Sequence, residues 1–480
     1  MILDMALNRA DFKKFFSPGQ IAIIGVSTGD YKLGGMSFLI KLQEGGFAGR
    51  LYPINPKAKQ IRNLKAYPDL LSLPEIPDLA IICVAARLVP AILEDCARND
   101  LKHIHILTAG FKETGLADGK LLEERIVAIS KTYGLKIIGP NCMGPYCPSS
   151  NLTAWGAIPG LSGSVGIISQ SGGLTQRLTE YICSLGIGVE KAVSFGNAAV
   201  LDSTDFLEVM AEDEEIRVIA MYLESVKNAR RLLQVAKETS KKKPIILWKG
   251  GESEAGAATA ASHTGGMSGA QKLWEAFCRQ TGVIRVRSMD ECVDAIMALS
   301  LLPGPAGNGV FLIGGGGGNS VAYSDAFNRE QFEVPPLSES SMDFLRRSVP
   351  IAGSIAGNPL DMWRTFIDAA YLSEVLELGY EDPAISIIVV DRLIPRMAYH
   401  FPDLADPTPE IITFIKNRQP AKPTVFTIDS DGGDPDLAET GTRLRAQFCK
   451  NGIPAYPSAK RAARALFHLC QYYARQRCYE

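Results

Sequence analysis

One histidine, His263, stands in a segment whose composition favours chemistry over packing. The residues from Ala257 to Gly269 read AATAASHTGGMSG, so the neighbouring sequence offers no bulky side chain to bury the imidazole. A neutral imidazole nitrogen is nucleophilic near neutral pH and can accept a phosphoryl group. These features indicate a phosphoryl-accepting histidine. The alternative is a loop histidine that caps a turn.

A phosphoryl group needs donors around it, and the first candidates are Ser171, Gly172 and Gly173. The segment Ser169–Gly173, which contains them, directly follows the apolar run 165–168 and precedes a helical pattern. Backbone N–H groups at a helix start face an anion, and the helix dipole favours negative charge there. We therefore predict a phosphate cradle at this helix start.

A second cradle is predicted where five consecutive glycines occupy positions 314–318, again after an apolar run and before a helical pattern. Consecutive glycines cost backbone entropy, so a loop rarely contains them unless something approaches the backbone closely. Gly317 and Gly318 would then open the helix and face the anion.

One carboxylate is expected near these cradles, because Glu224 follows the apolar run 218–222. Open α/β folds gather their ligands at the carboxyl ends of the strands. A carboxylate at that edge could accept the second N–H of an imidazole and hold the reactive tautomer. A solvated glutamate at a strand end is the alternative.

The first apolar run of the chain ends in a turn that contains Gly25 and Ser27. Glycine at such a turn lets the backbone approach a phosphate. After the second run, 51–54, an NAD-binding protein would have a carboxylate that grips the ribose, but this chain has Asn55 and Lys57. The pattern favours a nucleotide-like cofactor with an extra phosphate over NAD, and a plain tight turn is the alternative.

The elements that must position these residues follow one another in a regular order. Short apolar runs rich in β-branched residues alternate with longer amphipathic stretches, which is typical of βαβ units around parallel sheets. We therefore predict an α/β fold. Breaker-rich segments at 139–160 and 302–309 suggest domains at 1–150, 151–302 and 303–480. The clearest strands are expected at 21–24, 79–84, 103–107, 165–168, 218–222, 244–248, 310–313 and 385–390.

Composition narrows the class of protein. The chain has 480 residues, 52 acidic and 50 basic side chains and a formal net charge of -2, with both signs mixed along its length. Such a surface offers no basic face for a nucleic acid or an anionic membrane, so we expect neither as a partner. The N-terminus lacks the pattern of a signal peptide, and the ten cysteines contain no CxxC pair. We expect a cytoplasmic protein with reduced cysteines and no metal site.

Together these motifs resemble the NDP-forming acyl-CoA synthetases, the superfamily that includes succinyl-CoA synthetase and ADP-forming acetyl-CoA synthetase. The similarity extends over nearly the whole chain and is closest to the α subunit of the ADP-forming enzymes. The segments that carry it are Ile24–Ser27, Tyr52–Lys57, Ala109–Gly115, Gly139–Gly144, Ser169–Gly173, Tyr222–Ser225, Ser262–Gly265 and Asn358–Asp361.

The resemblance implies a Rossmann-like CoA-binding domain, a flavodoxin-like domain with the phosphohistidine loop, and a third, flavodoxin-like domain. It also implies two groups of CoA-binding residues. Those at the phosphates and nucleotide end would be Gly25, Ser27, Asn55 and Lys57, and those near the pantetheine and thiol would be Ala85 and Asn141.

By the same resemblance, His263 would carry the phosphoryl group, Glu224 would steady it, and both glycine cradles would hold the phosphoryl group. The substrates would be an acyl-CoA or carboxylic acid, CoA and phosphate. The family binds ADP or ATP with Mg²⁺ on an ATP-grasp module, for which the chain has no room after its third sheet. We therefore expect an ATP-grasp β subunit in an αβ or α2β2 assembly. The second cradle departs from the family pattern at Gly314, Gly315, Asn319 and Ser320. A CoA-binding or acyl-CoA-binding sensor without catalysis is the rival hypothesis.

Overall fold

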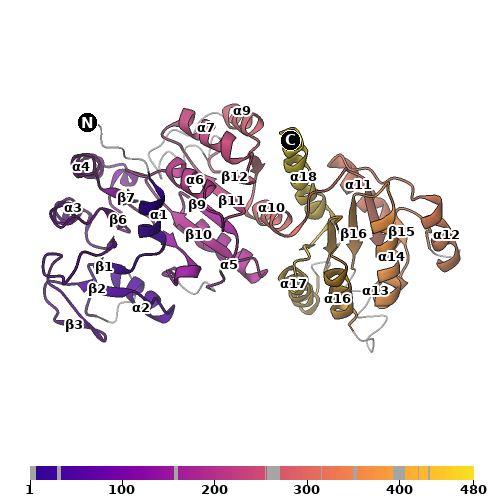
Figure 1. Ribbon diagram of the computed structural model, residues 1–480, viewed down its shortest axis with the longest axis horizontal. Coiled ribbons are helices and arrows are strands. Elements are labelled where there is room, and N and C mark those ends of the chain that lie inside the picture. The colour runs from indigo at the N-terminus through magenta and orange to yellow at the C-terminus, as the bar shows by residue number, and fades with distance from the viewer. Residues whose placement is uncertain are drawn as a thin grey trace. The chain divides into compact units, whose positions relative to one another are not determined.

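The structure is a computed structural model of the 480-residue chain. It describes residues 7–29, 34–155, 160–253, 256, 271–314, 316–349, 354–392, 406–419, 421–430 and 433–479. The chain forms two compact units, which comprise Met1–Cys183 with Gly188–Ser288, and Ser184–Ile187 with Met289–Glu480. The first unit contains two large sheets and the second unit contains one (Figure 1).

The first sheet is parallel and has the order β2-β1-β5-β6-β7. Its strands are β1 (Gln20–Ile24), β2 (Arg50–Ile54), β5 (Leu79–Ile82), β6 (His103–Ile106) and β7 (Lys136–Ile138). Successive residues of β1 alternate between two hydrophobic clusters, because neighbouring side chains of a strand point to opposite faces. Helices α1 (Arg9–Phe16) and α2 (Gly35–Glu44) contribute to one cluster, and α3 (Val89–Arg98) and α4 (Ala117–Tyr133) to the other. The sheet is therefore covered on both faces.

The second sheet has the order β13-β12-β11-β9-β10-β8, and all its pairs are parallel except that of β8 with β10. Its strands are β8 (Gly144–Tyr146), β9 (Val165–Ser169), β10 (Val189–Ser194), β11 (Val218–Leu223), β12 (Ile245–Lys249) and β13 (Ile284–Val286). Its helices are α5 (Gly172–Ser184), α6 (Ser203–Ala211), α7 (Ala229–Thr239) and α9 (Gln271–Thr281). Strand β8 precedes residue 150, where we expected the first domain to end, yet it forms an edge of this second sheet.

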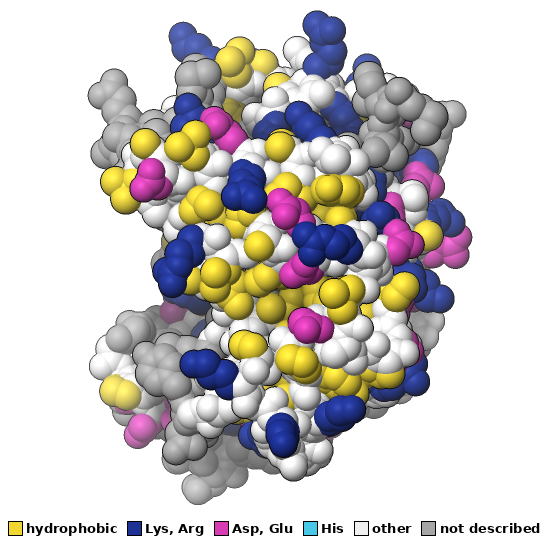
Figure 2. Space-filling view, turned by 90° about the vertical axis from the view of Figure 1, so that its left-hand side faces the viewer, with side chains coloured by type: hydrophobic (Ala, Val, Ile, Leu, Met, Phe, Trp, Pro, Cys, Tyr) yellow, Lys and Arg dark blue, Asp and Glu magenta, His cyan; other side chains and the backbone are white. Residues whose placement is uncertain are grey.

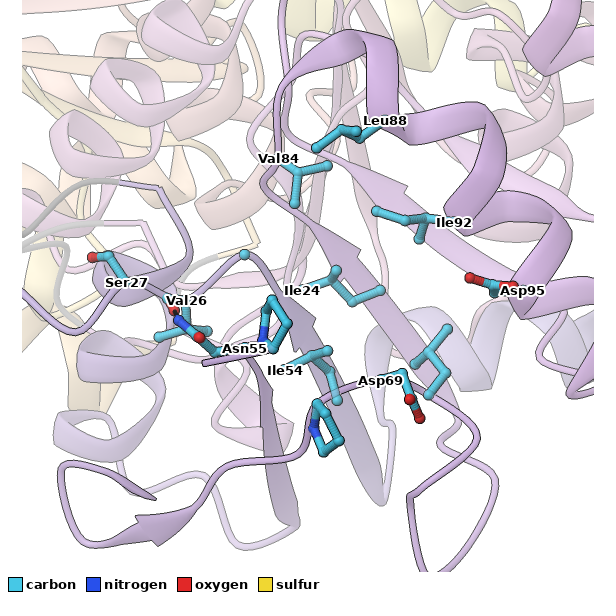
Figure 3. Close-up of a pocket in the computed structure, with 14 residues that line it drawn as sticks. Ile24, Val26, Ser27, Ile54, Asn55, Asp69, Val84, Leu88, Ile92 and Asp95 are labelled. Atoms are coloured by element: carbon cyan, nitrogen blue, oxygen red, sulfur yellow. Dashed lines mark hydrogen bonds between the residues drawn. The ribbon is translucent and has the colours of Figure 1, made fainter. Parts of the chain in front are cut away.

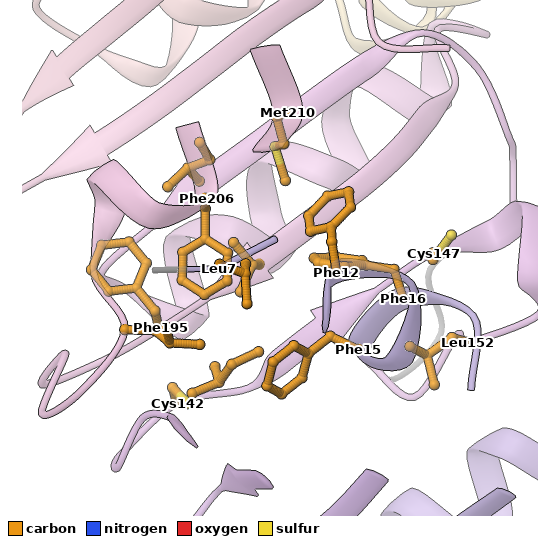
Figure 4. Packing of buried hydrophobic residues seen from close by; sticks show 14 of the residues in the cluster. Leu7, Phe12, Phe15, Phe16, Cys142, Cys147, Leu152, Phe195, Phe206 and Met210 are labelled. Carbon is orange, nitrogen blue, oxygen red and sulfur yellow. The ribbon is translucent and has the colours of Figure 1, made fainter. Parts of the chain in front are cut away.

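The first and second sheets share one hydrophobic core, which helix α1 helps to build (Figure 4). Phe15 and Phe16 of α1 are completely buried, and they belong to the same cluster as Phe195 and Phe206 from the second sheet's side. Full burial of a phenylalanine side chain contributes about 2 to 3 kcal/mol to stability. The two sheets of the first unit are therefore held together by apolar packing as well as by the hydrogen bonds described below.

The sheet of the second unit is parallel and has the order β15-β14-β16-β17-β18. Its strands are β14 (Val310–Gly314), β15 (Leu360–Asp361), β16 (Ile387–Asp391), β17 (Thr424–Thr427) and β18 (Ala455–Tyr456). Its helices are α10 (Met289–Leu301), α11 (Gly317–Arg329), α12 (Glu339–Ser348), α13 (Arg364–Ile367), α14 (Ala369–Glu381), α16 (Thr408–Arg418), α17 (Pro435–Lys450) and α18 (Ala459–Gln476). The α/β class with parallel sheets, predicted from the sequence, is confirmed.

The surface agrees with the balanced composition. Figure 2 shows basic and acidic side chains interspersed over one face, with hydrophobic side chains between them. Among the helices in the described part of the chain, none is both long and apolar enough to cross a membrane.

Candidate functional site

The turn after β1 brings its backbone unusually close to the neighbouring strand. Gly25 has a φ of +92°, and a Cβ atom at this position would lie 2.6 Å from the carbonyl oxygen of Cys83. The amide of Gly25 donates to the carbonyl of Ile54, at the end of β2, over 3.2 Å. Only glycine can therefore occupy this turn, as the sequence pattern indicated.

A cavity of about 370 Å³ opens beside this turn, at the carboxyl ends of β1, β2 and β5 (Figure 3). Three of the predicted CoA-binding residues, Gly25, Ser27 and Asn55, line it together. Apolar side chains form much of the remaining wall, and they are Ile24, Val26, Ile54, Leu70, Val84, Leu88 and Ile92. A cavity with apolar walls and a few polar groups at one end suits a planar base attached to a charged or polar chain.

Asn55 organises the polar end of this cavity. Its Nδ2 donates to the carbonyl of Val26 over 2.7 Å, which ties the end of β2 to the turn after β1. Its Oδ1 accepts from the amides of Lys57 and Ala58, at 2.9 and 3.1 Å. Lys57 is thereby placed in a defined turn with its side chain exposed. Ala85 is exposed immediately before a short 3-10 helix at the end of β5.

Two carboxylates of the cavity escaped the sequence analysis. Asp69 and Asp95 both line it, although neither follows β2, where a ribose-binding acid was sought. Asp95 forms an ion pair with Arg98 over 2.6 Å. No local signal could have found these two residues, because their placement depends on how α3 and the segment after β4 (Leu64–Lys65) fold back over the sheet edge.

Asn141 lies where the two sheets of the first unit meet. It has a φ of +59°, and its amide donates to the carbonyl of Thr108 over 2.9 Å. The turn after β10 packs on this segment, because the amide of Asn197 donates to the carbonyl of Pro140 over 3.1 Å. A Cβ at Gly196 would lie 2.3 Å from the carbonyl oxygen of Asn141, so the two backbones are in direct contact. The second sheet therefore supports a residue predicted to lie near the CoA thiol.

The predicted cradle at the start of α5 is built from hydroxyl groups and glycines. The Oγ of Ser171 accepts from the amide of Leu174 over 3.3 Å, which caps the helix. The Oγ of Ser169 accepts from the amide of Ser171 over 3.2 Å. A Cβ at Gly172 would lie 2.9 Å from Cγ of Met143, whereas one at Gly173 would meet no atom within 4 Å. The helix start is thus tightly packed at its first residue and open at its second.

Glu224 is held next to this cradle by one side chain. The Oε1 of Gln170, the residue between the two cradle serines, accepts from the amides of Glu224 and Ser225 at 2.5 and 2.9 Å. Glu224 is only 7% exposed, and its Oε1 accepts from the hydroxyl of Tyr222 over 3.2 Å. The structure therefore brings the predicted carboxylate and the predicted cradle to one edge of the second sheet.

A buried lysine at the same edge was missed. Lys249 ends β12, donates to the carbonyl of Gly250 and lies 5.4 Å from the ring centre of Trp274. Burial lowers the pKa of Lys249, while the negative charges of Glu252 and Glu224 oppose this shift. In the sequence, Lys249 is a single lysine after an apolar run. Many lysines without a special role also stand at the end of a strand, so this pattern did not distinguish it.

The second unit contains the other predicted cradle. Helix α11 begins at Gly317, and Gly318 follows with open space at its Cβ position. The amide of Gly316 donates to Oδ1 of Asp361 over 2.5 Å. Asp361 ends the neighbouring strand β15 and is 8% exposed. A carboxylate of the protein therefore sits at this helix start.

His263, the predicted phosphoryl acceptor, lies outside the described residues, as do residues 257–270 around it.

Two family models match within the first 299 residues of the chain. The chain matches the family of CoA binding domains over residues 19–148 and the succinyl-CoA ligase-like flavodoxin domain over residues 162–299. It is also 34% identical to the ADP-forming acetate–CoA ligase II subunit alpha of Pyrococcus furiosus, over 95% of this chain and 97% of that protein. The chain belongs to the ADP-forming acyl-CoA synthetase family.

Other members of the ADP-forming acyl-CoA synthetase family extend the comparison. A solved structure of the dinucleotide-forming acetyl-coenzyme A synthetase 1 of Ca. Korarchaeum cryptofilum, in complex with phosphate and ADP, matches with a TM-score of 0.83 and 31% identity over 98% of both chains. The ADP-forming acetate–CoA ligase I of Archaeoglobus fulgidus is 35% identical over 78% of this chain but only 54% of its own length. The family assignment made from the sequence motifs is confirmed, and the match is to the α-subunit type.

Proposed function

We propose that this chain is the α subunit of an acid–thiol ligase, which interconverts acyl-CoA, phosphate and ADP with a free acid, CoA and ATP. The observation that carries the proposal is the pair of hydrogen bonds that Gln170 accepts from the backbone of Glu224 and Ser225. Gln170 belongs to the cradle segment and binds the backbone of Glu224, so a helix start suited to an anion and a buried carboxylate form one rigid group.

The proposed reaction has three transfers. A phosphate oxygen attacks the thioester carbonyl of the acyl-CoA, the C–S bond breaks, and CoA leaves with the bonding electron pair. A ring nitrogen of His263 then attacks the phosphorus of the acyl phosphate, and the carboxylate leaves. Finally, an oxygen of the β-phosphate of ADP attacks the phosphohistidine, which restores the imidazole and yields ATP. The reverse sequence activates the acid.

Each group of predicted residues has a role in this scheme. Ser171, Gly172 and Gly173 would hold the phosphoryl oxygens through backbone N–H groups, and Glu224 would orient the imidazole by accepting its other N–H. Gly317 and Gly318 are proposed as the second cradle. Gly25, Ser27, Asn55 and Lys57 would hold the nucleotide end of CoA, and Ala85 and Asn141 would lie near the pantetheine and thiol.

We also propose that the nucleotide and Mg²⁺ are bound by a separate ATP-grasp β subunit, in an αβ or α2β2 assembly. Two similarities support this. The relative from Pyrococcus furiosus is named as an alpha subunit and has almost the same length as this chain. The relative from Archaeoglobus fulgidus has additional sequence that this chain does not match. The proposed place of action is the cytoplasm.

The test incubates the purified chain with radiolabelled phosphate and a panel of short, branched and aromatic acyl-CoAs, alone and with the ATP-grasp subunit. Acid-labile, alkali-stable label that depends on one acyl-CoA identifies the half-reaction and the acid. His263→Ala should abolish this label. His400→Ala is the control, because His400 is the other histidine outside the described residues, and it should retain the label. Label that persists in His263→Ala would overturn the phosphohistidine mechanism. If the chain binds CoA but no label forms under any of these conditions, the rival hypothesis of a CoA-binding sensor without catalysis is favoured.

A further inference from the structure

The side chain of Asn197 stands between two carboxylates and the predicted CoA-binding residue Asn141. Its Nδ2 donates to Oε2 of Glu113 over 2.5 Å and to Oε2 of Glu123 over 2.8 Å. Glu113 belongs to a 3-10 helix and Glu123 to α4, both on the first sheet's side, whereas Asn197 follows β10 of the second sheet. This contact therefore spans the two sheets of the first unit.

Hydrogen bonds from three neighbours favour the ionised form of Glu113. Its Oε1 accepts from the amides of Gly110 and Phe111, at 2.6 and 3.1 Å. Burial alone would raise the pKa of this carboxyl, but the hydrogen bonds from Asn197, Gly110 and Phe111 outweigh burial and lower it. An ionised carboxylate can only accept hydrogen bonds. Glu113 consequently fixes which end of the Asn197 amide faces it.

The orientation of the Asn197 amide in turn determines which atom of the Asn141 amide faces it. Because the NH2 group of Asn197 must face the carboxylates, its Oδ1 faces Asn141 and accepts from Nδ2 of that residue over 3.4 Å. This contact engages the NH2 group of Asn141. The contact uses one of the two N–H donors of Asn141 and turns its NH2 group toward Asn197, so that Oδ1, an acceptor, lies on the other side of the amide.

We propose that Asn197 is a positioning residue for CoA, which orients the amide of Asn141 so that its Oδ1 accepts a hydrogen bond from an N–H or S–H group near the thiol end of the coenzyme. Glu113 and Glu123 orient the Asn197 amide, and Asn197 orients the Asn141 amide; we call this chain of hydrogen bonds the relay. The proposal rests on the proposed function, in which Asn141 lies near the pantetheine and thiol.

The side chain of Asn197 is not needed to dock its own segment. The backbone amide of Asn197 binds the carbonyl of Pro140, and that of Ala199 binds the carbonyl of Gly139 over 2.9 Å. Lys227 also donates from its Nζ to the carbonyl of Ala199 over 2.8 Å. Truncation at position 197 should therefore leave the segment in place and remove only the relay.

The experiment measures the affinity of the full chain for CoA by titration calorimetry in a double-mutant cycle. Asn197→Ala and Asn141→Ala should each weaken CoA binding roughly tenfold, as expected for the loss of one oriented hydrogen bond. The double variant should bind no more weakly than Asn141→Ala alone, because Asn197 acts through Asn141. Additive losses would show that Asn197 acts separately, and would overturn the proposal.

Two further variants keep the test decisive. Asn197→Ser must reproduce the loss, so that wild-type affinity in this variant would overturn the proposal even if Asn197→Ala folds poorly. Ser149→Ala removes a hydrogen bond to Glu190, of 2.8 Å, elsewhere in the first unit and should leave CoA affinity unchanged. Failure of the wild-type chain to bind CoA would instead overturn the CoA site of the proposed function, and with it this inference. The two failures are therefore distinguishable.

Discussion

Two strand-to-helix turns share a glycine pattern and differ in electrostatics. The turn between β9 and α5, in the first unit, is capped by neutral hydroxyl groups, with Ser171 accepting from the amide of Leu174 over 3.3 Å. The turn between β14 and α11, in the second unit, binds a carboxylate, because the amide of Gly316 donates to Asp361 over 2.5 Å. The positive end of a helix favours an anion, and a protein carboxylate beside it partly neutralises that field and repels a second anion.

The difference shows that a glycine-rich helix start does not define a phosphate site by itself. At the first turn the nearby carboxylate, Glu224, is fixed through its own backbone by Gln170. At the second turn the carboxylate of Asp361 binds the turn directly. We therefore expect the first turn to dominate phosphoryl transfer, and the following experiments test that ranking.

The largest effect is expected at Glu224. Glu224→Gln keeps the shape of the side chain but removes the charge that would orient the imidazole, so single-turnover phosphorylation should slow by about a hundredfold or more. Rapid-quench measurement of the acid-labile label would give this rate. Tyr222→Phe removes only the hydroxyl that donates to Glu224 over 3.2 Å, and it should change the rate by far less. An unchanged rate in Glu224→Gln would remove the proposed role.

The two caps should differ in their contribution to stability. Asp361→Ala removes a charged acceptor from the amide of Gly316 and should lower the free energy of unfolding of the second unit by about 2 kcal/mol. Ser171→Ala removes a neutral cap and should cost the first unit about 1 kcal/mol. Urea unfolding followed by a probe in each unit measures both. A larger loss for Ser171→Ala would contradict the electrostatic difference between the turns.

The local sequence predicted the parts of these turns but not their partners. The run 310–313 and the glycines after it correspond closely to β14 and the start of α11, because apolar runs and glycine breakers are local signals. The contact of Gly316 with Asp361 joins residues 45 positions apart in the sequence. It depends on the pairing of β14 with β15, which no local pattern encodes.

The same limit applied to the first unit. Motifs and family resemblance predicted Glu224 and Asn141 as site residues. They did not reveal that Gln170 binds the backbone of Glu224, or that Asn197 binds the side chain of Asn141, since both contacts cross between strands or sheets. Lys249 was missed for a related reason, because its burial depends on Trp274 packing beside it.

A second buried carboxylate near the α11 turn, that of Asp391, should make the stability of the second unit depend on pH. Asp391 lies against Gly314 and accepts from the hydroxyl of Tyr323 over 2.7 Å. Burial raises the pKa of Asp391 to about 6, although the hydrogen bonds from Tyr323 and Thr427 oppose this shift. The folded state therefore binds the proton more tightly than the unfolded state. The resulting stabilisation is complete below about pH 4 and is lost as the pH rises through about 6.

Asp391→Asn should remove this dependence, because the amide is uncharged and still offers an oxygen to Tyr323. At pH 7.5 we expect the variant to be about 1 to 2 kcal/mol more stable than the wild type, with the advantage developing between about pH 4 and pH 6. Denaturant unfolding at a series of pH values measures the difference. Burial also raises the pKa of Asp294 to about 6. Because Asp294 is present in both proteins, its contribution cancels in the difference between their stabilities. A stability difference that does not change with pH would contradict the assignment.

The smallest effect on stability, and the most direct comparison of the two turns, comes from a matched pair of glycines. Gly173 and Gly318 are each the second residue of their helix, and a Cβ at either position meets no atom within 4 Å. Alanine should therefore stabilise each unit by about 0.5 kcal/mol. A close phosphoryl group would nevertheless meet the new methyl group, so Gly173→Ala should slow phosphorylation more than Gly318→Ala does. Equal slowing would mean that both turns hold the phosphoryl group, in spite of the carboxylate of Asp361 at the second.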